Sequence, residues 1–253
     1  MINPMDHPVF LLLFSLPVFW FSSWLGASFR RRQRDIQEST RSDLTFVLGG
    51  TMTLLGLIIG FTYSMAVTRY DQRKNYEEEE ANAIGTEYVR ADYLPTAETV
   101  KIRALLKNYL YQRILYYEAG QGEKLSEINS QTTRLQAEMW NEIVPSTSAR
   151  PTQVAALVVS GMNNVLNSQG YTQAAWWNRI PIAAWTLLVL ISVFCNLLIG
   201  YCVHGRSNYL LLILPVALSI SLFLIADIES PRGGTIHVRP QNLESLARSL
   251  DSQ

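Results

Sequence analysis

The stretch LTFVLGGTMTLLGLIIGFTYSMAVT (residues 44–68) runs directly into RYDQRKNYEEEEANAIGTEYVRADYL (residues 69–94). The first part has no charged side chain, the second is rich in Arg and Glu, and no proline interrupts either. A helix of ~20 apolar residues is enough to cross the hydrocarbon core of a bilayer. The join therefore predicts one long helix that begins within the membrane and ends in water, before Pro95.

Three further uncharged runs have membrane-spanning length: residues 8–29, 180–203 and 207–226. A composition of 48% hydrophobic and 17% charged residues with zero net charge would also suit a soluble domain, so the distribution decides the class. The first run lacks the positive residues that precede the apolar core of a signal peptide, and Arg30, Arg31 and Arg32 follow it instead. We expect a retained helix there. The sequence thus predicts an all-α integral membrane protein with four transmembrane helices in two hairpins.

Breaks in the apolar pattern divide the chain into four parts. These are a first transmembrane hairpin (1–68), a helical extramembrane domain into which the second helix extends (69–179), a second transmembrane hairpin (180–226) and an ordered C-terminal tail (227–253). The extramembrane domain reads as amphipathic helices: one capped by Thr96, one from 123 to 144 that ends before Pro145, and one from 152 to 168 that Gly170 ends. The tail reads as a turn, a short strand (235–239) and a helix capped by Asn242.

The loop from 30 to 43 contains five arginines, which favours cytoplasmic connections within both hairpins. Arg69, Arg73 and Lys74 lie at the opposite end of the second helix and weaken this asymmetry. The two cysteines, Cys195 and Cys202, lie two helical turns apart in one apolar run, so we expect them to be packing residues rather than a disulfide.

Small residues form a stripe along the second helix at spacings of three and four: Gly49, Thr53, Gly56, Gly60 and Ser64. In lipid, such a stripe lets two helix backbones approach closely. The alternative is a pore wall, where missing side chains leave room and hydroxyls face water. Both interpretations hold if the helix packs around the axis of an oligomer.

Asp227 and Glu229 end the fourth helix, and a carboxylate near the membrane is usually paired or hydrated. A local ion pair with Arg232 is one interpretation, and a gating or ion-sensing role for the three residues is the other. Within the run 77–80, four consecutive glutamates point around a helix, so we expect a solvated face rather than a calcium site. Asn196, inside the third helix, is expected to form a hydrogen bond between helices.

The sequence offers no catalytic constellation: it has no GxSxG, P-loop or dinucleotide fingerprint, and its three histidines lie far apart. We therefore expect no enzymatic activity, no catalytic residue, no cofactor and no metal site. The lipid bilayer is an expected partner and nucleic acid is not.

Several motifs resemble the bacterial bestrophin-like domain family of unknown function: GFTYSMA (60–66), RYDQR (69–73), EANAIGT (80–86), RADYLP (90–95) and LIADIESPRGG (224–234). The name of that family implies a relation to bestrophins, pentameric anion channels whose second membrane helix lines the pore. The resemblance thus implies a homo-oligomer, a pentamer by analogy, in the inner membrane of a bacterial cell, with small anions as permeating ions.

Two functions follow from these observations. The first is an oligomeric, bestrophin-like ion channel with the second helix lining the axis. The second is a non-conducting sensor or scaffold whose extramembrane bundle binds a ligand or a partner.

Overall fold

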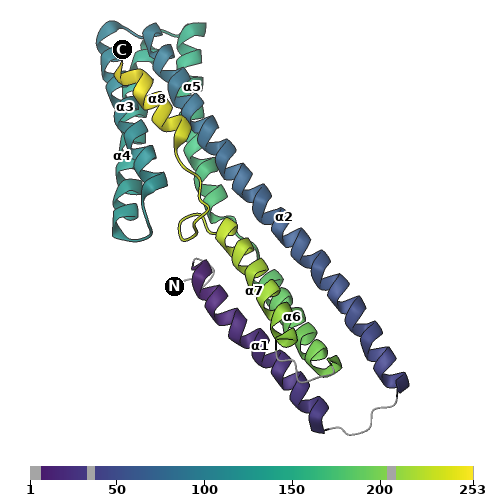
Figure 1. Cartoon of the computed structure of the whole chain (residues 1–253). Helices are drawn as coiled ribbons and strands as arrows, with labels where there is room; N and C mark the ends of the chain where they lie inside the picture. Colours follow the sequence, from purple (N-terminus) through teal and green to yellow (C-terminus); the bar gives the residue numbers. More distant parts are fainter. Residues whose placement is uncertain (1–6, 33–37, 204–208, 253) are drawn as a thin grey trace. The chain divides into compact units, whose positions relative to one another are not determined.

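The computed structural model describes residues 7–32, 38–203 and 209–252, and every regular element in these ranges is a helix. Figure 1 shows the elements in order. They are α1 (Pro8–Arg32), α2 (Glu38–Arg90), the short 3₁₀ helix η2 (Ala91–Tyr93), α3 (Thr96–Glu118), α4 (Glu123–Ala149), α5 (Gln153–Trp177), α6 (Ile182–Cys202), α7 (Leu210–Glu229) and α8 (Gln241–Asp251).

Four helical stretches are long and apolar enough to cross a membrane: Pro8–Arg32, Ser42–Tyr93, Gln153–Cys202 and Leu211–Glu229. They coincide with the four predicted spans. Within the third stretch, the membrane-spanning part is α6. The predicted connection at 30–43 is shorter than expected, because α1 continues to Arg32 and α2 begins at Glu38. Residues 33–37 of this connection, the second connection at 204–206 and the start of the fourth span at 207 lie outside the described residues. The predicted long helix is confirmed, because α2 continues without a break for 53 residues through Tyr70.

The chain forms two compact units. The first contains residues 1–69 and 179–237, and the second contains residues 70–178 and 238–253. In the first unit, α1 packs against both α6 and α7. All regular secondary structure of this unit is helical within the described ranges.

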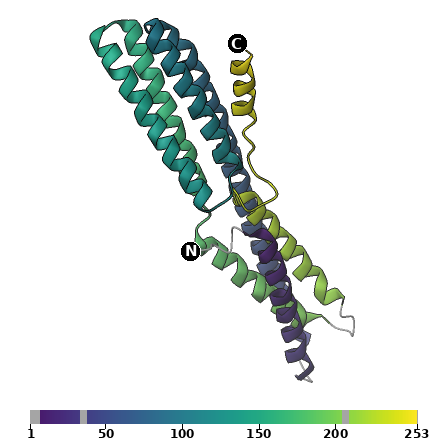
Figure 2. The same cartoon turned by 90° about the vertical axis from the view of Figure 1, so that its left-hand side faces the viewer.

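The second unit is a bundle around one apolar core. Side chains of α2, α3, α4, α5 and α8 share this core, among them Ile84, Leu106, Met139, Met162 and Leu243, all fully buried. Figure 2 shows α3, α4 and α5 running alongside one another in this unit. The predicted amphipathic helices therefore do bury their apolar faces against each other.

Two predicted helix ends and one predicted helix cap in the second unit are wrong. Pro145 lies inside α4, which continues to Ala149, and Gly170 lies inside α5, which continues to Trp177. A proline in the last turns removes only one intrahelical hydrogen bond, and a helical glycine costs about 1 kcal/mol, so packing outweighs both. Thr96 is the first residue of α3, whose N-cap position is Pro95, so Thr96 does not cap it.

The tail also differs from its prediction. Residues 235–239 form no strand, because Asp227 holds the N–H groups of Thr235 and Ile236 in place of a strand partner. Asn242 lies in the first turn of α8 and does not cap it, since the cap position is Pro240.

Candidate functional site

The membrane part of α2 buries only a narrow face within the first unit. Leu48, Leu55, Thr62 and Ala66 are each at most 9% exposed, and their spacings of seven, seven and four place them on one side of the helix. Only 11% of the apolar window of α2 is buried, against 56% for the window in α7. Most of the circumference of α2 is therefore open in a single protomer.

The predicted small-residue stripe lies on this open surface. Gly49, Thr53, Gly56, Gly60 and Ser64 are all exposed, about 120° around the helix from the buried face. A Cβ atom built on Gly49, Gly56 or Gly60 would meet no atom within 4 Å. The stripe therefore takes no part in close helix packing inside the protomer, whereas the hydroxyl of Thr53 donates to the carbonyl of Gly49 within α2.

A third face of α2 is open but bulky. Leu54, Phe61 and Met65 are between 44% and 65% exposed and lie about 120° beyond the stripe. The open surface of α2 is thus divided into a small-residue side and a large apolar side.

Close helix packing in the first unit occurs between α1 and α6. A Cβ on Gly200 would collide with the carbonyl oxygen of Ser23, and one on Gly26 would collide with the carbonyl of Leu197. The Ser23 hydroxyl donates a hydrogen bond of 3.1 Å to Oδ1 of buried Asn196, which confirms the predicted hydrogen bond between helices. The close contacts at Gly26 and Gly200 were missed, because the sequence does not say which helices lie side by side.

The Glu229 carboxylate ties three elements of the first unit together. Its Oε1 accepts from Arg69 at the end of the membrane part of α2 (3.2 Å) and from the backbone N–H of Ile180, just before α6 (2.6 Å). The Arg179 guanidinium donates to the Glu229 carbonyl at 3.2 Å. With 3% of its side chain exposed, Glu229 is a buried junction of α2, α6 and α7. Sequence analysis missed Arg69 as its partner, because 160 residues separate the two.

Asp227 closes the turn after α7. Its carboxylate accepts from the Thr235 N–H and hydroxyl, both at 2.7 Å, and from the Ile236 N–H at 3.1 Å. Arg232 is half-buried within this turn. The structure therefore places the three predicted residues, Asp227, Glu229 and Arg232, near one another at the end of α7.

In the second unit, the prediction of a solvated glutamate face is wrong for two of the four residues. Glu78 and Glu79 are exposed, but Glu77 and Glu80 are at most 1% exposed. Glu77 accepts from the N–H groups of Asn242 and Leu243 and from the Asn242 side chain, and so caps α8 from outside the helix. Burial raises the pKa of Glu77, and these hydrogen bonds oppose the rise.

Glu80 forms a buried ion pair with Arg113 of α3, in which both side chains have no exposure. The Thr172 hydroxyl of α5 also donates to Glu80 at 3.2 Å, and the Arg113 guanidinium lies 4.3 Å from the ring centre of Tyr116. This cluster joins α2, α3 and α5 inside the core. Breaking such a pair leaves an uncompensated buried charge, at a cost of about 3–5 kcal/mol.

Glu87 is the third buried glutamate of α2, and neither of its carboxylate oxygens has a hydrogen-bond partner among the described residues. It lies against Gly161 of α5, where a Cβ would collide with both Glu87 and Arg90. Burial raises the pKa of Glu87 to about 8, although the nearby Arg90 guanidinium lowers it.

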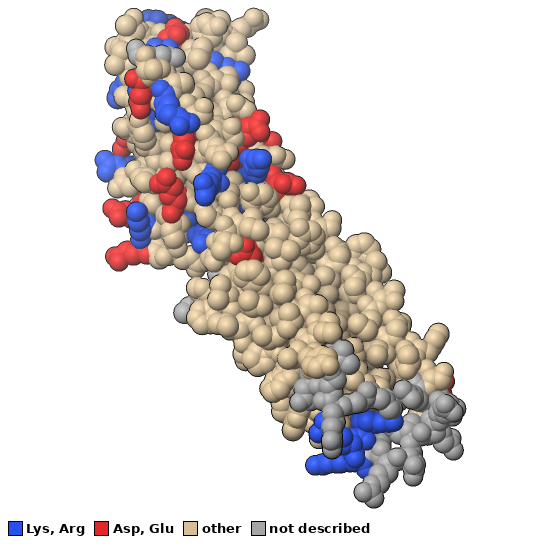
Figure 3. All heavy atoms as spheres, in the orientation of Figure 1, with Lys and Arg blue, Asp and Glu red and all other residues tan. Residues whose placement is uncertain are grey.

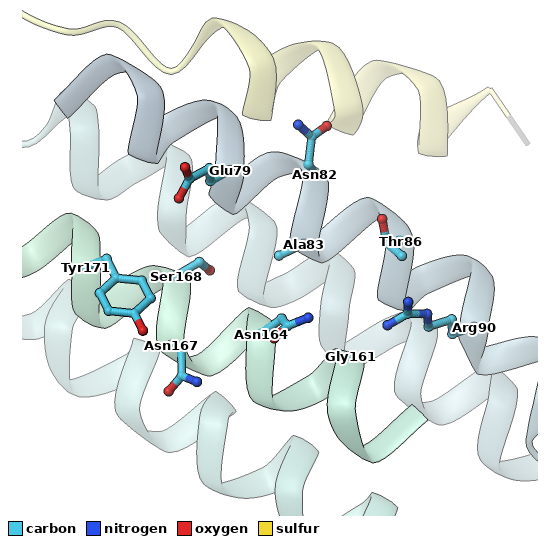
Figure 4. A pocket seen from close by; sticks show the side chains of 10 residues that line it. All are labelled: Glu79, Asn82, Ala83, Thr86, Arg90, Gly161, Asn164, Asn167, Ser168 and Tyr171. Atoms are coloured by element: carbon cyan, nitrogen blue, oxygen red, sulfur yellow. The ribbon is translucent and has the colours of Figure 1, made fainter. Parts of the chain in front are cut away.

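Beside Glu87 an open polar groove of about 480 Å³ runs between α2 and α5. Figure 4 shows its lining, which comes from both helices and is dominated by amide, hydroxyl and charged groups. The groove includes Asn82, Thr86, Arg90, Asn164, Asn167 and Tyr171. It offers hydrogen-bond donors and acceptors together with one cationic side chain, which suits a small polar ligand.

A family model, the Bestrophin-like domain, matches residues 12–243. The chain belongs to the Bestrophin-like domain family. It is an integral membrane protein of this family with four transmembrane helices, as its apolar helices require.

Solved structures support the same fold. A crystal structure of a bacterial bestrophin homologue from Klebsiella pneumoniae with one substitution aligns with a TM-score of 0.66 at 15% identity, covering 99% of this chain and 98% of that one. Another crystal structure of a bestrophin homologue from this organism aligns with a TM-score of 0.66 at 15% identity, covering 96% and 97%. A comparison with curated proteins finds no match.

Proposed function

We propose that this bestrophin-like protein is an oligomeric channel in which copies of α2 surround a central passage. The main support for this proposal is the open surface of the membrane part of α2. Only 11% of its apolar window is buried within its own protomer, so the rest of the surface is available for contacts with other copies. Its small-residue side and its large apolar side differ in shape, as expected if one faces the axis and the other a neighbouring copy.

The small-residue side suits the axis. Gly49, Gly56 and Gly60 leave space there, and Thr53 and Ser64 supply hydroxyl groups. The alternative is that the glycines meet the next copy of α2 and that the bulky residues around Phe61 narrow the passage. In either case the passage has no charged ring between residues 44 and 68, so its walls do not select ions by side-chain charge at that depth.

Similarity to bestrophin homologues supports a ring, and the pentamer and small anions enter only through that resemblance. We place the protein in the inner membrane of a bacterial cell, with its arginine-rich connection in the cytoplasm, and infer a non-enzymatic role. Asp227, Glu229 and Arg232 are candidate gating residues, since the Glu229 junction with Arg69 links α2 to α7.

Ion flux from liposomes that contain the purified full-length protein tests this proposal. We expect a small anion such as chloride to leave the liposomes faster than from protein-free controls. A membrane that stays tight across a range of pH and calcium concentrations would contradict conduction.

A second candidate is a sensor or scaffold, and the groove between α2 and α5 favours it because its amide, hydroxyl and charged lining suits a small polar ligand. A thermal-shift screen of small polar metabolites tests it, with Asn164→Leu as the groove variant and the exposed Glu78→Ala as control. Tight liposomes together with a ligand shift that only Asn164→Leu removes would favour this function over the channel.

A further inference from the structure

A second groove lies in the membrane unit, between the last turns of α1 and the first turn of α7. Its volume is about 450 Å³. Its lining combines aromatic, polar, basic and apolar side chains: Trp20, Trp24, Ser28, Arg31, Leu211 and Leu212. None of these residues belongs to the α2 surface or to the Glu229 junction.

The mouth of this groove is electropositive. Arg30, Arg31 and Arg32 form the last turn of α1, and Figure 3 shows basic side chains gathered at the end of a broad uncharged surface. Arg31 lines the groove, is exposed and forms no ion pair with a carboxylate in the part of the chain that the structure describes. The first turn of α7 adds its positive helix end, and its N-cap residue Tyr209 provides no side-chain cap.

The depth of the groove matches one leaflet. Trp24 lies seven residues before Arg31 and Trp20 lies eleven before it, about 10 and 16 Å along the helix axis. Half of a bilayer hydrocarbon core is about 15 Å thick. Trp20 and Trp24 are 46% and 48% exposed, and the Trp24 ring stacks on Phe21 at 5.6 Å, so both indoles are available to a lipid chain, Trp24 in the upper part of the leaflet and Trp20 near the middle of the bilayer.

We propose that this groove binds one anionic phospholipid. Its phosphate would lie beside Arg31 and the first turn of α7, with Ser28 as a further hydrogen-bonding group. Its acyl chain would lie along Trp20, Trp24 and the two leucines of α7. A zwitterionic lipid carries the same phosphate, but it would also bring a cation beside three arginines, so a net negative headgroup fits better.

The groove fits a lipid better than free phosphate. Its apolar part extends about 16 Å from Arg31, and an inorganic ion bound at Arg31 would leave that part empty. The proposal is independent of conduction, since it rests on α1 and α7 and not on α2.

Native mass spectrometry of the full-length protein in detergent tests the proposal, with phosphatidylglycerol and phosphatidylcholine of the same acyl chains as probes. We expect phosphatidylglycerol to be retained preferentially. Arg31→Gln should weaken its binding about fivefold, the effect of one basic residue on an anionic lipid. Arg32→Gln removes the same charge from a residue that does not line the groove and is the matched control, expected to change little.

Equal losses in the two arginine variants, or equal retention of the two lipids, would overturn the proposal, because the arginines would then act only as a general surface charge. Displacement of phosphatidylglycerol by millimolar inorganic phosphate would also overturn it, in favour of a free-anion site. Trp24→Ala provides a second measurement: it should weaken both lipids while leaving the ratio between them unchanged, and an unchanged affinity for both would remove the acyl-chain part of the proposal.

Discussion

Three glutamates on one side of α2 occupy three different environments in the core of the second unit. Glu77 accepts hydrogen bonds from the start of α8, Glu80 pairs with Arg113, and Glu87 has no hydrogen-bond partner among the described residues. The first two accept hydrogen bonds from specific donors. For Glu87, burial is the main cause of the raised pKa, and no hydrogen bond within the described part of the chain opposes it.

This difference predicts that the stability of the second unit depends on pH through Glu87. Its pKa is about 8 in the folded protein and has an ordinary value of 4.5. Between these values the folded state binds the proton and the unfolded state does not, so the free energy of unfolding falls as pH rises from about 4.5 to about 8 and then levels off. We expect a loss on the order of 3 kcal/mol over this range.

Thermal unfolding of the purified protein at a series of pH values measures this effect, and Glu87→Gln is the matched variant because it keeps the shape and cannot ionise. The variant should lose most of the dependence between pH 5 and 8. If wild type and variant show the same pH profile, then Glu87 is not the titrating group.

Sequence analysis could not separate these glutamates because it lacked their partners. Helical spacing places Glu77, Glu80 and Glu87 near one another on the helix, but it does not say that this side is buried. The groups that make burial tolerable, such as Arg113, Thr172 and Asn242, come from other helices far along the chain. A buried side with three acids runs against the usual amphipathic pattern, so the solvated interpretation was the natural one.

At the level of elements, α8 depends on a cap that another helix supplies. Replacement of Glu77 by Ala removes the acceptor for two backbone N–H groups and the Asn242 side chain. The expected cost is about 1–3 kcal/mol, the penalty for buried donors left without partners. Hydrogen exchange should become faster over residues 241–251, while the adjacent exposed Glu78→Ala should leave exchange there unchanged. Equal protection of α8 in both variants would show that Glu77 does not hold it.

Glycines in different helices should differ sharply in their tolerance of a methyl group. Gly200→Ala forces α6 away from Ser23 of α1 and should destabilise the protein by about 1–3 kcal/mol. Gly50→Ala on α2 meets no atom within 4 Å in the protomer and lies outside the small-residue stripe, so folding should tolerate it. Thermal unfolding in detergent compares the two, and similar losses would contradict the packing of α1 on α6.

The membrane elements were largely predictable from the sequence, and the ends of the extramembrane helices were not. Uncharged runs of sufficient length determine the spans through the thickness of the bilayer, without knowledge of neighbours. Pro145 and Gly170 weaken a helix by amounts that tertiary packing readily offsets, so local signals alone placed those ends too early. The prediction of a strand at 235–239 was wrong, because no neighbouring strand pairs with this segment in the described structure.

For the whole molecule, we expect the small-residue side of α2 to face water and the bulky side to be dry. In a background without Cys195 and Cys202, Thr53→Cys should react with a hydrophilic thiol reagent in liposomes and lose ion flux. Leu54→Cys lies at the same depth but about 100° around the helix, on the bulky side, and is the matched control that should neither react at that rate nor lose flux. Reaction of Leu54→Cys alone would reverse the assignment and place the bulky side on the axis.

In the proposed channel, α2 faces a shared axis in an assembly of several copies. Electron cryomicroscopy of the full-length protein in lipid nanodiscs measures this directly. We expect a closed ring with a central opening, in which α2 is the helix nearest the axis and its small-residue side faces the opening, with Gly49, Thr53, Gly56, Gly60 and Ser64. A monomer, a dimer without an opening, or a ring in which α1 or α7 lies nearest the axis would contradict it.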